Sequence, residues 1–180
     1  MSVHLPTRLP GVLLRPWRAA DKADLVLQAN NRKVWRNMTH TFPHPYTSAD
    51  ADLWLAIAAD PGPSIQLAIE VDGRAAGGIG VIAGEGIFCN TAQFGYWLGE
   101  SYWGRGIASA AAQSLADRVA SERLFARLEA QVFEWNPPSM RVLENAGFTR
   151  EALLRCAATK DGRVIDTVLY ARVFPGVGAD

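Results

Sequence analysis

The stretch from residue 95 to residue 109 holds the residues whose types and spacing are best suited to chemistry. An apolar run typical of a strand is followed by the sequence Gly-Arg-Gly, and an alanine-rich run typical of a helix begins at Ile107. The first N–H groups of a helix have no intrahelical acceptor, and glycines let a ligand approach them closely. Arg105 adds a positive charge beside them. The sequence therefore predicts a phosphate or pyrophosphate site made by Gly104, Arg105, Gly106, Ile107, Ala108 and Ser109.

A second group of candidate residues lies near the start of a later predicted helix. Asn136 stands before two prolines, a pattern typical of a helix N-cap, and Ser139 falls in the first turn of the same helix. A capping role alone for Asn136 and a surface position for Ser139 are the alternatives to a ligand contact. Glu100, just past the predicted strand, is the carboxylate best placed by sequence to accept a proton. Its alternative is a loop glutamate paired with a nearby arginine.

The glycine loop also permits a rival interpretation as a dinucleotide-binding site. Gly104-x-Gly106-x-x-Ser109 loosely resembles the dinucleotide fingerprint, and Glu129 lies about 20 residues further on, where a ribose-binding acid is expected. The third position of that pattern is serine here, however. The strands upstream are joined by tight turns, whereas a parallel sheet needs crossover connections. Both features oppose the dinucleotide interpretation.

The elements that must position these residues follow from hydrophobic periodicity and turn signals. Apolar residues at four-residue steps from Ile107 predict an amphipathic helix. Asp-Gly at 72–73 and at 161–162 predicts two hairpin turns, and Thr47 with Asp50 predicts a capping box. The order β-α-α-β-β-β-α-β-α-β-β predicts a single α+β domain over residues 1–180, with a core of about 10–174. Strands are expected at 12–14, 66–71, 75–83, 92–98, 124–133, from 148 and at 165–173, and helices at 21–29, around 53–57, from 107 and at 137–147, with residues 30–46 irregular.

Composition argues against several classes of protein. With 18 Lys and Arg against 18 Asp and Glu the formal net charge is zero, so a nucleic-acid partner is not expected. The 2 cysteines show no metal-ligand spacing and no disulfide framework, which predicts no metal site and a reducing, cytoplasmic compartment. No signal peptide is evident, and the apolar run at 75–88 is too short to span a bilayer. The basic first forty residues form either a solvated helix face or a lip that attracts the phosphates of a ligand.

Two motifs carry a family resemblance. The sequence Trp103-Gly104-Arg105-Gly106-Ile107-Ala108 resembles the acyl-CoA pyrophosphate loop of the GNAT N-acetyltransferases. The sequence Asn136-x-x-Ser139-x-Arg141-Val142-Leu143-Glu144-x-Ala146-Gly147-Phe148 is typical of the ribosomal-protein N-terminal (alanine) acetyltransferase-like subgroup of that superfamily. The order of the predicted elements extends the resemblance over nearly the whole chain.

The resemblance implies a GNAT fold, with a mixed, mostly antiparallel central sheet flanked by helices. It implies acetyl-CoA as cosubstrate and direct transfer of acetyl to a primary amine, on a protein N-terminus or a small molecule, in a ternary complex. By position in the family, Leu98 and Gly99 end a strand that splays from its neighbour and pairs with pantetheine, Asn136 contacts the pantetheine arm, and Ser139 protonates the departing thiolate. The acceptor and the choice between monomer and homodimer stay open. A non-catalytic CoA-binding module and, less favoured, a dinucleotide-binding protein are the alternatives.

Overall fold

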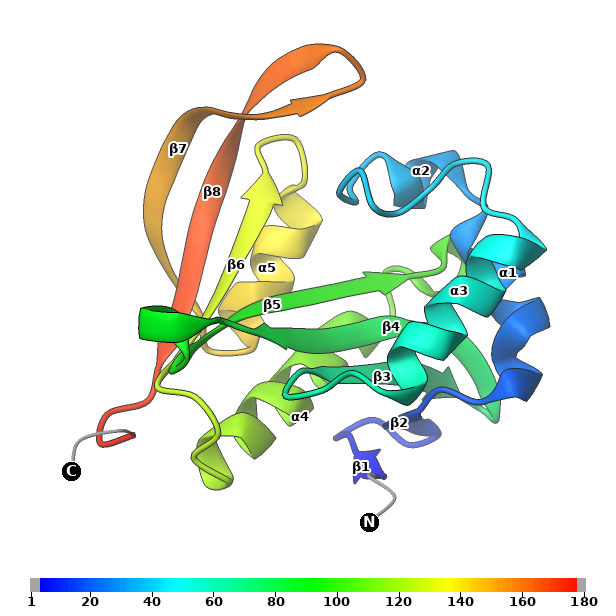
Figure 1. The fold of residues 1–180 in the computed structure, drawn as a ribbon, viewed down its shortest axis with the longest axis horizontal. Helices are drawn as coiled ribbons and strands as arrows, with labels where there is room; N and C mark the ends of the chain where they lie inside the picture. The colour runs from blue at the N-terminus through cyan, green and yellow to red at the C-terminus, as the bar shows by residue number, and fades with distance from the viewer. Residues whose placement is uncertain (1–3, 178–180) are drawn as a thin grey trace.

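A computed structural model describes residues 4–177, and in it one 8-stranded sheet crosses the molecule in the order β1-β2-β3-β4-β5-β6-β8-β7 (Figure 1). Neighbouring strands are antiparallel except β5 and β6, which run parallel. The sheet is therefore mixed and mostly antiparallel, as the family resemblance implies. The strands are β1 (Leu5–Pro6), β2 (Val12–Pro16), β3 (Ile65–Val71), β4 (Arg74–Ala83), β5 (Thr91–Leu98), β6 (Arg127–Phe133), β7 (Thr149–Lys160) and β8 (Arg163–Val173).

Helices cover both faces of this sheet (Figure 1). Successive side chains of a strand point to opposite faces of the sheet. In β3, Leu67 and Ile69 pack in the hydrophobic cluster that includes α4 and α5, whereas Ala68 packs in the cluster that includes α1 and α3. The helices are α1 (Lys22–Ala29), α2 (Arg32–Trp35), α3 (Ser48–Ala59), α4 (Ile107–Ser121) and α5 (Pro137–Asn145), with three short 3₁₀ turns at Ala19–Asp21, Gly86–Phe88 and Glu100–Tyr102.

The local signals in the sequence act as expected. Ile107, Ala111, Leu115 and Val119 are all buried along one face of α4. The two Asp-Gly pairs have positive φ at both positions, 49° and 85° at 72–73 and 51° and 71° at 161–162, as a two-residue hairpin turn requires. The Thr47 side chain caps α3 and forms a capping box with Asp50. These predictions are confirmed.

Three elements differ from the expectation. The strand expected from residue 124 begins at Arg127, because the chain leaving α4 first makes a turn in which the N–H of Leu124 donates to the carbonyl of Val119. The short strand β1 was not expected. The stretch 30–46, expected to be irregular, contains the one-turn helix α2, which Asn31 caps by accepting from the N–H groups of Lys33 and Val34. Such a short helix leaves no periodic pattern to recognise.

The predicted extent of the domain, residues 1–180, reaches into positions 1–3 and 178–180, which lie outside the described residues. Within residues 4–177, no helix is long and apolar enough to cross a membrane.

Candidate active site

The parallel strands β5 and β6 open a gap in the middle of the sheet. They pair only at Thr91–Gln93 with Arg127–Glu129, although β5 continues to Leu98 and β6 to Phe133 (Figure 1). Beyond Gln93 the edge of β5 that faces β6 has no strand partner, while its other edge stays paired with β4. The gap is the splay that the family resemblance implies for this strand. An unpaired strand edge inside a protein can bind an extended ligand through its backbone.

The end of β5 uses part of its hydrogen-bonding capacity within the protein. The N–H of Gly99 donates to the carbonyl of Ala76 in β4 at 2.8 Å, and the Leu98 carbonyl accepts from the indole N–H of Trp103 at 2.7 Å. Because successive residues of a strand point their N–H groups to opposite edges, the N–H of Leu98 faces the gap. Of the two predicted residues, Leu98 therefore presents a free donor there. A Cβ at Gly99 would lie 2.1 Å from the Oε1 of Gln28, so a side chain there would require Gln28 to move.

The loop before α4 has the geometry of an anion cradle. Gly104 and Gly106 have φ of 73° and 74°, a left-handed conformation that favours glycine. Gly106 is the N-cap of α4, and no side chain caps this helix. In the described part of the chain, no acceptor meets the N–H groups of the first three helical residues. No protein atom lies within 4 Å of a Cβ built at Gly104, so the loop is open to a ligand. The six residues predicted for the phosphate site all lie here: Gly104, Arg105, Gly106, Ile107, Ala108 and Ser109.

The start of α5 forms a second polar corner. The Asn136 side chain caps the helix by accepting from the N–H of Ser139 at 3.3 Å. The Tyr96 hydroxyl donates to the Ser139 carbonyl at 2.9 Å and lies 2.7 Å from the Ser139 hydroxyl, which is then the donor in this second contact. Burial raises the pKa of Tyr96, and the hydrogen bond with Ser139 only partly offsets this effect, so the phenol keeps its proton. Tyr96 comes from β5 and was missed from sequence, because an aromatic residue in a strand is most often part of the core.

The helix α5 sets the separation between these two polar regions. Its last residue, Asn145, donates to the hydroxyl of Ser109 at the start of α4, at 3.4 Å. Its first turn carries Ser139, about 9 Å away at 1.5 Å per residue. The anion cradle and the Ser139 corner therefore lie at the two ends of one short helix. A compact anion can contact only the cradle, whereas an elongated ligand can occupy both.

Glu100 follows β5 but is held by two neighbours. Its carboxylate accepts from the Asn31 amide at 2.8 Å and from the Lys33 ammonium. These two hydrogen bonds, that from Lys33 first, lower the pKa of Glu100. A lowered pKa makes a carboxylate a weaker proton acceptor. The arrangement favours the alternative that the sequence left open, a loop glutamate paired with a cation, and the cation is a lysine.

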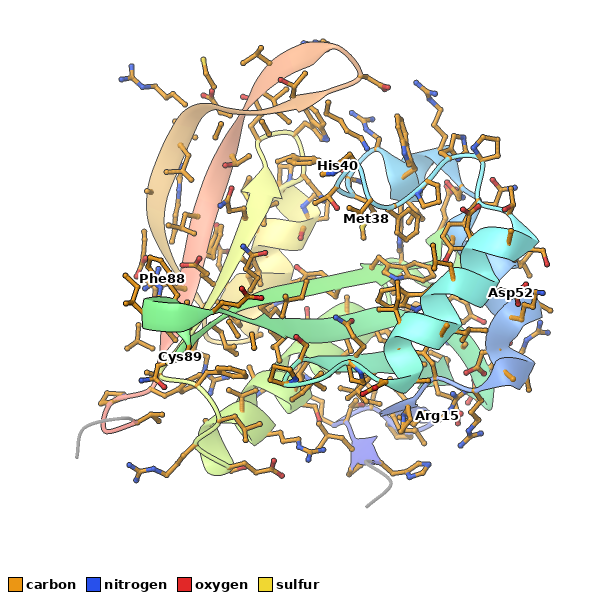
Figure 2. All side chains as sticks on the ribbon, viewed as in Figure 1. Arg15, Met38, His40, Asp52, Phe88 and Cys89 are labelled. Carbon is orange, nitrogen blue, oxygen red and sulfur yellow. The ribbon has the colours of Figure 1, made fainter. Side chains whose placement is uncertain are left out.

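The segment after α2 contacts the loop that precedes Asn136, and so lies close to the start of α5 that carries Ser139. The Trp135 indole N–H, one residue before Asn136, donates to the Asn37 side chain at 3.1 Å. The Lys160 ammonium, at the tip of the β7–β8 hairpin, donates to the Met38 carbonyl at 2.9 Å. Figure 2 labels Met38 on this segment, which lies between α2 and the start of α5. Residues 35–38 thus connect α2 with the β6–α5 loop and the hairpin.

Other candidate chemistries find little support. Within residues 4–177, no group of three or more His, Cys, Asp and Glu could hold a metal ion. Cys89 and Cys156 are free and exposed. Glu129, the acid of the dinucleotide interpretation, lies where β5 and β6 are still paired and bonds to Arg127 at 3.1 Å, away from the open end of the gap. The strands before the loop, β3, β4 and β5, pair antiparallel with their neighbours in the chain. A dinucleotide-binding fold needs parallel strands there, so this pairing opposes the dinucleotide interpretation.

Two curated proteins are similar to part of the chain. An uncharacterized N-acetyltransferase p20 of Bacillus licheniformis is 39% identical over 80 residues, which is 44% of this chain and 45% of that protein. A ribosomal-protein-serine acetyltransferase of Escherichia coli K12 is 37% identical over 83 residues, 46% of either chain. The chain thus matches less than half the length of these curated relatives.

A solved structure extends the likeness to the whole fold. The ribosomal L7/L12 alpha-N-protein acetyltransferase RimL, in complex with coenzyme A, superposes with a TM-score of 0.82 at 23% identity and covers 96% of this chain and 98% of its own. The family model for the acetyltransferase (GNAT) domain matches residues 12–149, from β2 to the start of β7. This match includes the splayed strands, the anion loop and the Ser139 corner, and the chain therefore belongs to the GNAT acetyltransferase family.

Proposed function

We propose that this protein is an N-acetyltransferase, which transfers an acetyl group from acetyl-CoA to a primary amine by direct attack in a ternary complex. The single observation that carries the proposal is the gap between β5 and β6, with an anion cradle at one end and the Ser139–Tyr96 pair at the other. Membership of the GNAT family supports it, as do the relatives named as acetyltransferases and the coenzyme A bound to the RimL structure.

The residues present fit acetyl-CoA as the cosubstrate. The open cradle at residues 104–109 suits its diphosphate, because backbone N–H groups at a helix start bind phosphate. The free N–H of Leu98 suits an amide of the pantetheine arm. The Asn136 side chain caps α5 with its oxygen, and its Nδ2 has no acceptor in the described residues, so it can donate to the same arm. Gly99 offers this arm less than predicted, since its N–H is bonded to the Ala76 carbonyl and its carbonyl accepts from the N–H of Tyr102 at 3.0 Å.

A thioester is already activated, so the reaction needs proton transfers and no covalent nucleophile. The nitrogen of the neutral amine forms a bond to the thioester carbonyl carbon, and the carbon–sulfur bond breaks. The amine loses a proton to solvent, and the sulfur leaves as a thiolate. Ser139 donates its hydroxyl proton to that thiolate. Tyr96 turns its O–H from the Ser139 carbonyl to the Ser139 Oγ and replaces the proton across their 2.7 Å contact. Solvent then returns a proton to Tyr96, which balances the proton that the amine released. The raised pKa of Tyr96 keeps this donor protonated at neutral pH.

Thermal unfolding together with thiol release tests the proposal. Acetyl-CoA at 100 times its dissociation constant should stabilise the folded protein by about 2.7 kcal/mol, and NAD at the same concentration should not. A panel of primary amines should then produce steady release of free thiol. No stabilisation by acetyl-CoA contradicts cofactor binding. Stabilisation without thiol release for any amine supports the alternative, a CoA-binding module without catalysis.

The remaining predictions about the protein's surroundings stay proposals. The free, exposed cysteines agree with a reducing, cytoplasmic compartment. We expect no nucleic-acid partner, because the formal net charge is zero. We expect no membrane partner. The protein acts as a monomer or homodimer, which size-exclusion chromatography with light scattering distinguishes.

A further inference from the structure

Three cationic side chains lie over two tryptophan rings, Trp35 and Trp135, near the segment after α2, which we call the acceptor side of the gap. The Lys160 ammonium lies 3.7 Å from the centroid of the Trp35 ring, and the Arg32 guanidinium lies 5.4 Å from it. The Arg36 guanidinium stacks over the nearby Trp135 ring at 5.6 Å. We call Lys160, Arg32 and Arg36 the cationic cluster. Its members come from α2, the residue after α2 and the β7–β8 hairpin, so only the folded chain brings them together.

Lys160 is a buried cation without a counter-ion. Only 8% of the residue is exposed, and within residues 4–177 no carboxylate lies within 4.0 Å of its ammonium group. Its one hydrogen bond goes to the Met38 carbonyl, and it also lies over the Trp35 ring, so neither of these two contacts supplies a negative charge. Burial lowers the pKa of Lys160, and the neighbouring Asp161 only partly offsets this effect. A buried charge in this state gains from any anion that reaches it.

The surrounding charges do not neutralise the cluster. Arg32 pairs with Asp161 at 3.2 Å, with both side chains exposed, and Lys33 pairs with Glu100. Arg36 has no carboxylate within ion-pair distance in the described residues. Glu134, the acid nearest to Trp135 in sequence, is not among the ion pairs that Arg32 or Lys33 forms, and no ion pair joins it to Lys160 or Arg36 in the described residues. Lys160 and Arg36 therefore remain without anionic partners.

The cluster lies beside the proposed reaction centre. Trp135, under Arg36, directly precedes Asn136 and is bonded to Asn37. Asn136 in turn caps the turn that carries Ser139. The residues that hold the cations are thus one short loop away from the hydroxyl proposed to protonate the thiolate. Figure 2 shows Met38 and His40 on this segment, and Cys89 on the opposite side of the molecule.

We propose that the acceptor bears an anionic group, a carboxylate or a phosphate, within a few residues of its reacting amine, and that Lys160 and Arg36 bind this group. The inference rests on the proposed function and specifies its substrate class. It selects acidic peptide N-termini and small anionic amines among the acceptors that the sequence leaves open. It opposes polyamines and aminoglycosides, because these polycations bring positive charge to a site that already has an excess of it.

A structural role for Lys160, as a tie between the hairpin and the segment after α2, predicts something different. Loss of that tie affects all acceptors equally, whereas loss of an anion receptor changes the preference between acceptors. The measurement is therefore the ratio of kcat/KM for an acidic peptide to kcat/KM for a basic one. The matched acceptors are Ser-Glu-Glu-Ala, Ser-Gln-Gln-Ala and Ser-Lys-Lys-Ala, each with an amidated C-terminus. Phosphoserine and spermidine are measured alongside them. The same ratio is measured for Lys160→Gln, Lys160→Arg, Arg36→Gln and the control Lys22→Gln, which removes an α1 cation that is paired with Asp52 of α3.

We expect the parent protein to prefer the acidic peptide over the lysine peptide by about tenfold or more. Lys160→Gln should reduce that preference to near one, Arg36→Gln should reduce it in part, and Lys160→Arg and Lys22→Gln should retain it. Phosphoserine turnover that depends on Lys160 identifies a small anionic amine as sufficient. Equal turnover of the acidic and lysine peptides, or an unchanged ratio in Lys160→Gln, overturns the proposal.

Calorimetric binding of the acidic peptide to the complex with CoA gives a second readout that needs no turnover. Binding that weakens about tenfold in Lys160→Gln supports the anion receptor, and no binding by the parent overturns it. Stabilisation by acetyl-CoA is measured on the same samples. A protein that binds acetyl-CoA but shows no charge preference refutes this inference alone, whereas a protein that does not bind acetyl-CoA refutes the proposed function.

Discussion

At one end of the gap between β5 and β6, a single stretch of chain offers backbone N–H groups through the left-handed glycines 104 and 106. At the other end, side chains meet from α2, the β6–α5 loop and the β7–β8 hairpin, and the contacts that join them span 98 residues for Asn37–Trp135 and 122 for Met38–Lys160. The first end is made by backbone geometry, and the second by tertiary contacts. A site made of main-chain atoms keeps its ligand when exposed side chains are replaced, but not when its glycines are. A site made of side chains changes its ligand preference when any of those side chains is replaced.

This difference explains why a cosubstrate can be shared while acceptors differ. The exposed side chain of Arg105 stacks loosely on Tyr102 at 5.8 Å, and the cradle beside it is formed by main-chain atoms. The acceptor side depends on side chains such as the buried Lys160 and the half-buried Trp35, which come from separate elements. Function is therefore constrained at one end of the gap and adjustable at the other.

The largest effect is expected from Ser139→Ala, at the end of the gap opposite the cradle. Removing the proposed general acid should lower kcat by roughly 10²–10⁴-fold, with affinity for acetyl-CoA retained, because the cradle is untouched. Tyr96→Phe should lower kcat by a smaller factor of about ten, since the serine hydroxyl remains. Steady-state kinetics with a reactive amine measures both. The matched control is Ser121→Ala, which removes an exposed serine that bonds only to the Arg118 carbonyl. Parental turnover in Ser139→Ala would show that water protonates the thiolate.

Gly106→Val should affect the backbone end alone. The φ of 74° is strained for valine. The Cβ would meet only Leu9, at 4.0 Å, so the side chain has room, and we expect it to crowd the helix start to which we assign the diphosphate. Affinity for acetyl-CoA should fall by about 100-fold. Gly62→Val is the control, since Gly62 also has a positive φ, of 60°, in an open turn. Both variants should lose similar stability in chemical denaturation, and only Gly106→Val should lose affinity. Equal affinity in the two folded variants would mean that the loop is only a turn.

Features formed by neighbours in the chain could be predicted from the sequence, whereas features formed by tertiary contacts could not. The hairpin turns, the α3 cap and the buried face of α4 depend on neighbours in the chain, so residues such as Asp72 and Thr47 indicate them directly. The positive φ of the loop glycines agrees with the phosphate site predicted from their spacing. The hydrogen bond between Tyr96 and Ser139 joins residues 43 positions apart, and no local pattern indicates it. The burial of Lys160 against Trp35 is likewise set by packing alone.

The smallest effect is expected from Glu100→Gln, which separates the two roles considered for this carboxylate. The hydrogen bonds from Lys33 and Asn31 lower the pKa of Glu100 below its ordinary value of 4.5. Such a group contributes its favourable interaction above pH 4.5 and loses it as pH falls through the lowered value, so at pH 6–9 its charge is constant. A rise of turnover over pH 6–9 then reports the acceptor amine, which for a peptide N-terminus titrates near 7.7–8.0.

We therefore expect Glu100→Gln to change kcat less than about threefold and to leave the midpoint of the pH–rate profile unmoved, because the paired carboxylate does not accept the proton. The measurement is kcat from pH 5.5 to 9.5 with one peptide acceptor, for the parent and the variant, with acetyl-CoA saturating. Lys22→Gln serves again as the control for a change of one charge on the surface. A loss of 100-fold or more in Glu100→Gln, with normal acetyl-CoA affinity, would instead make Glu100 the base. In that case the Lys33 ammonium would have to move away in the ternary complex, and the acceptor end of the gap would be less rigid than its contacts indicate.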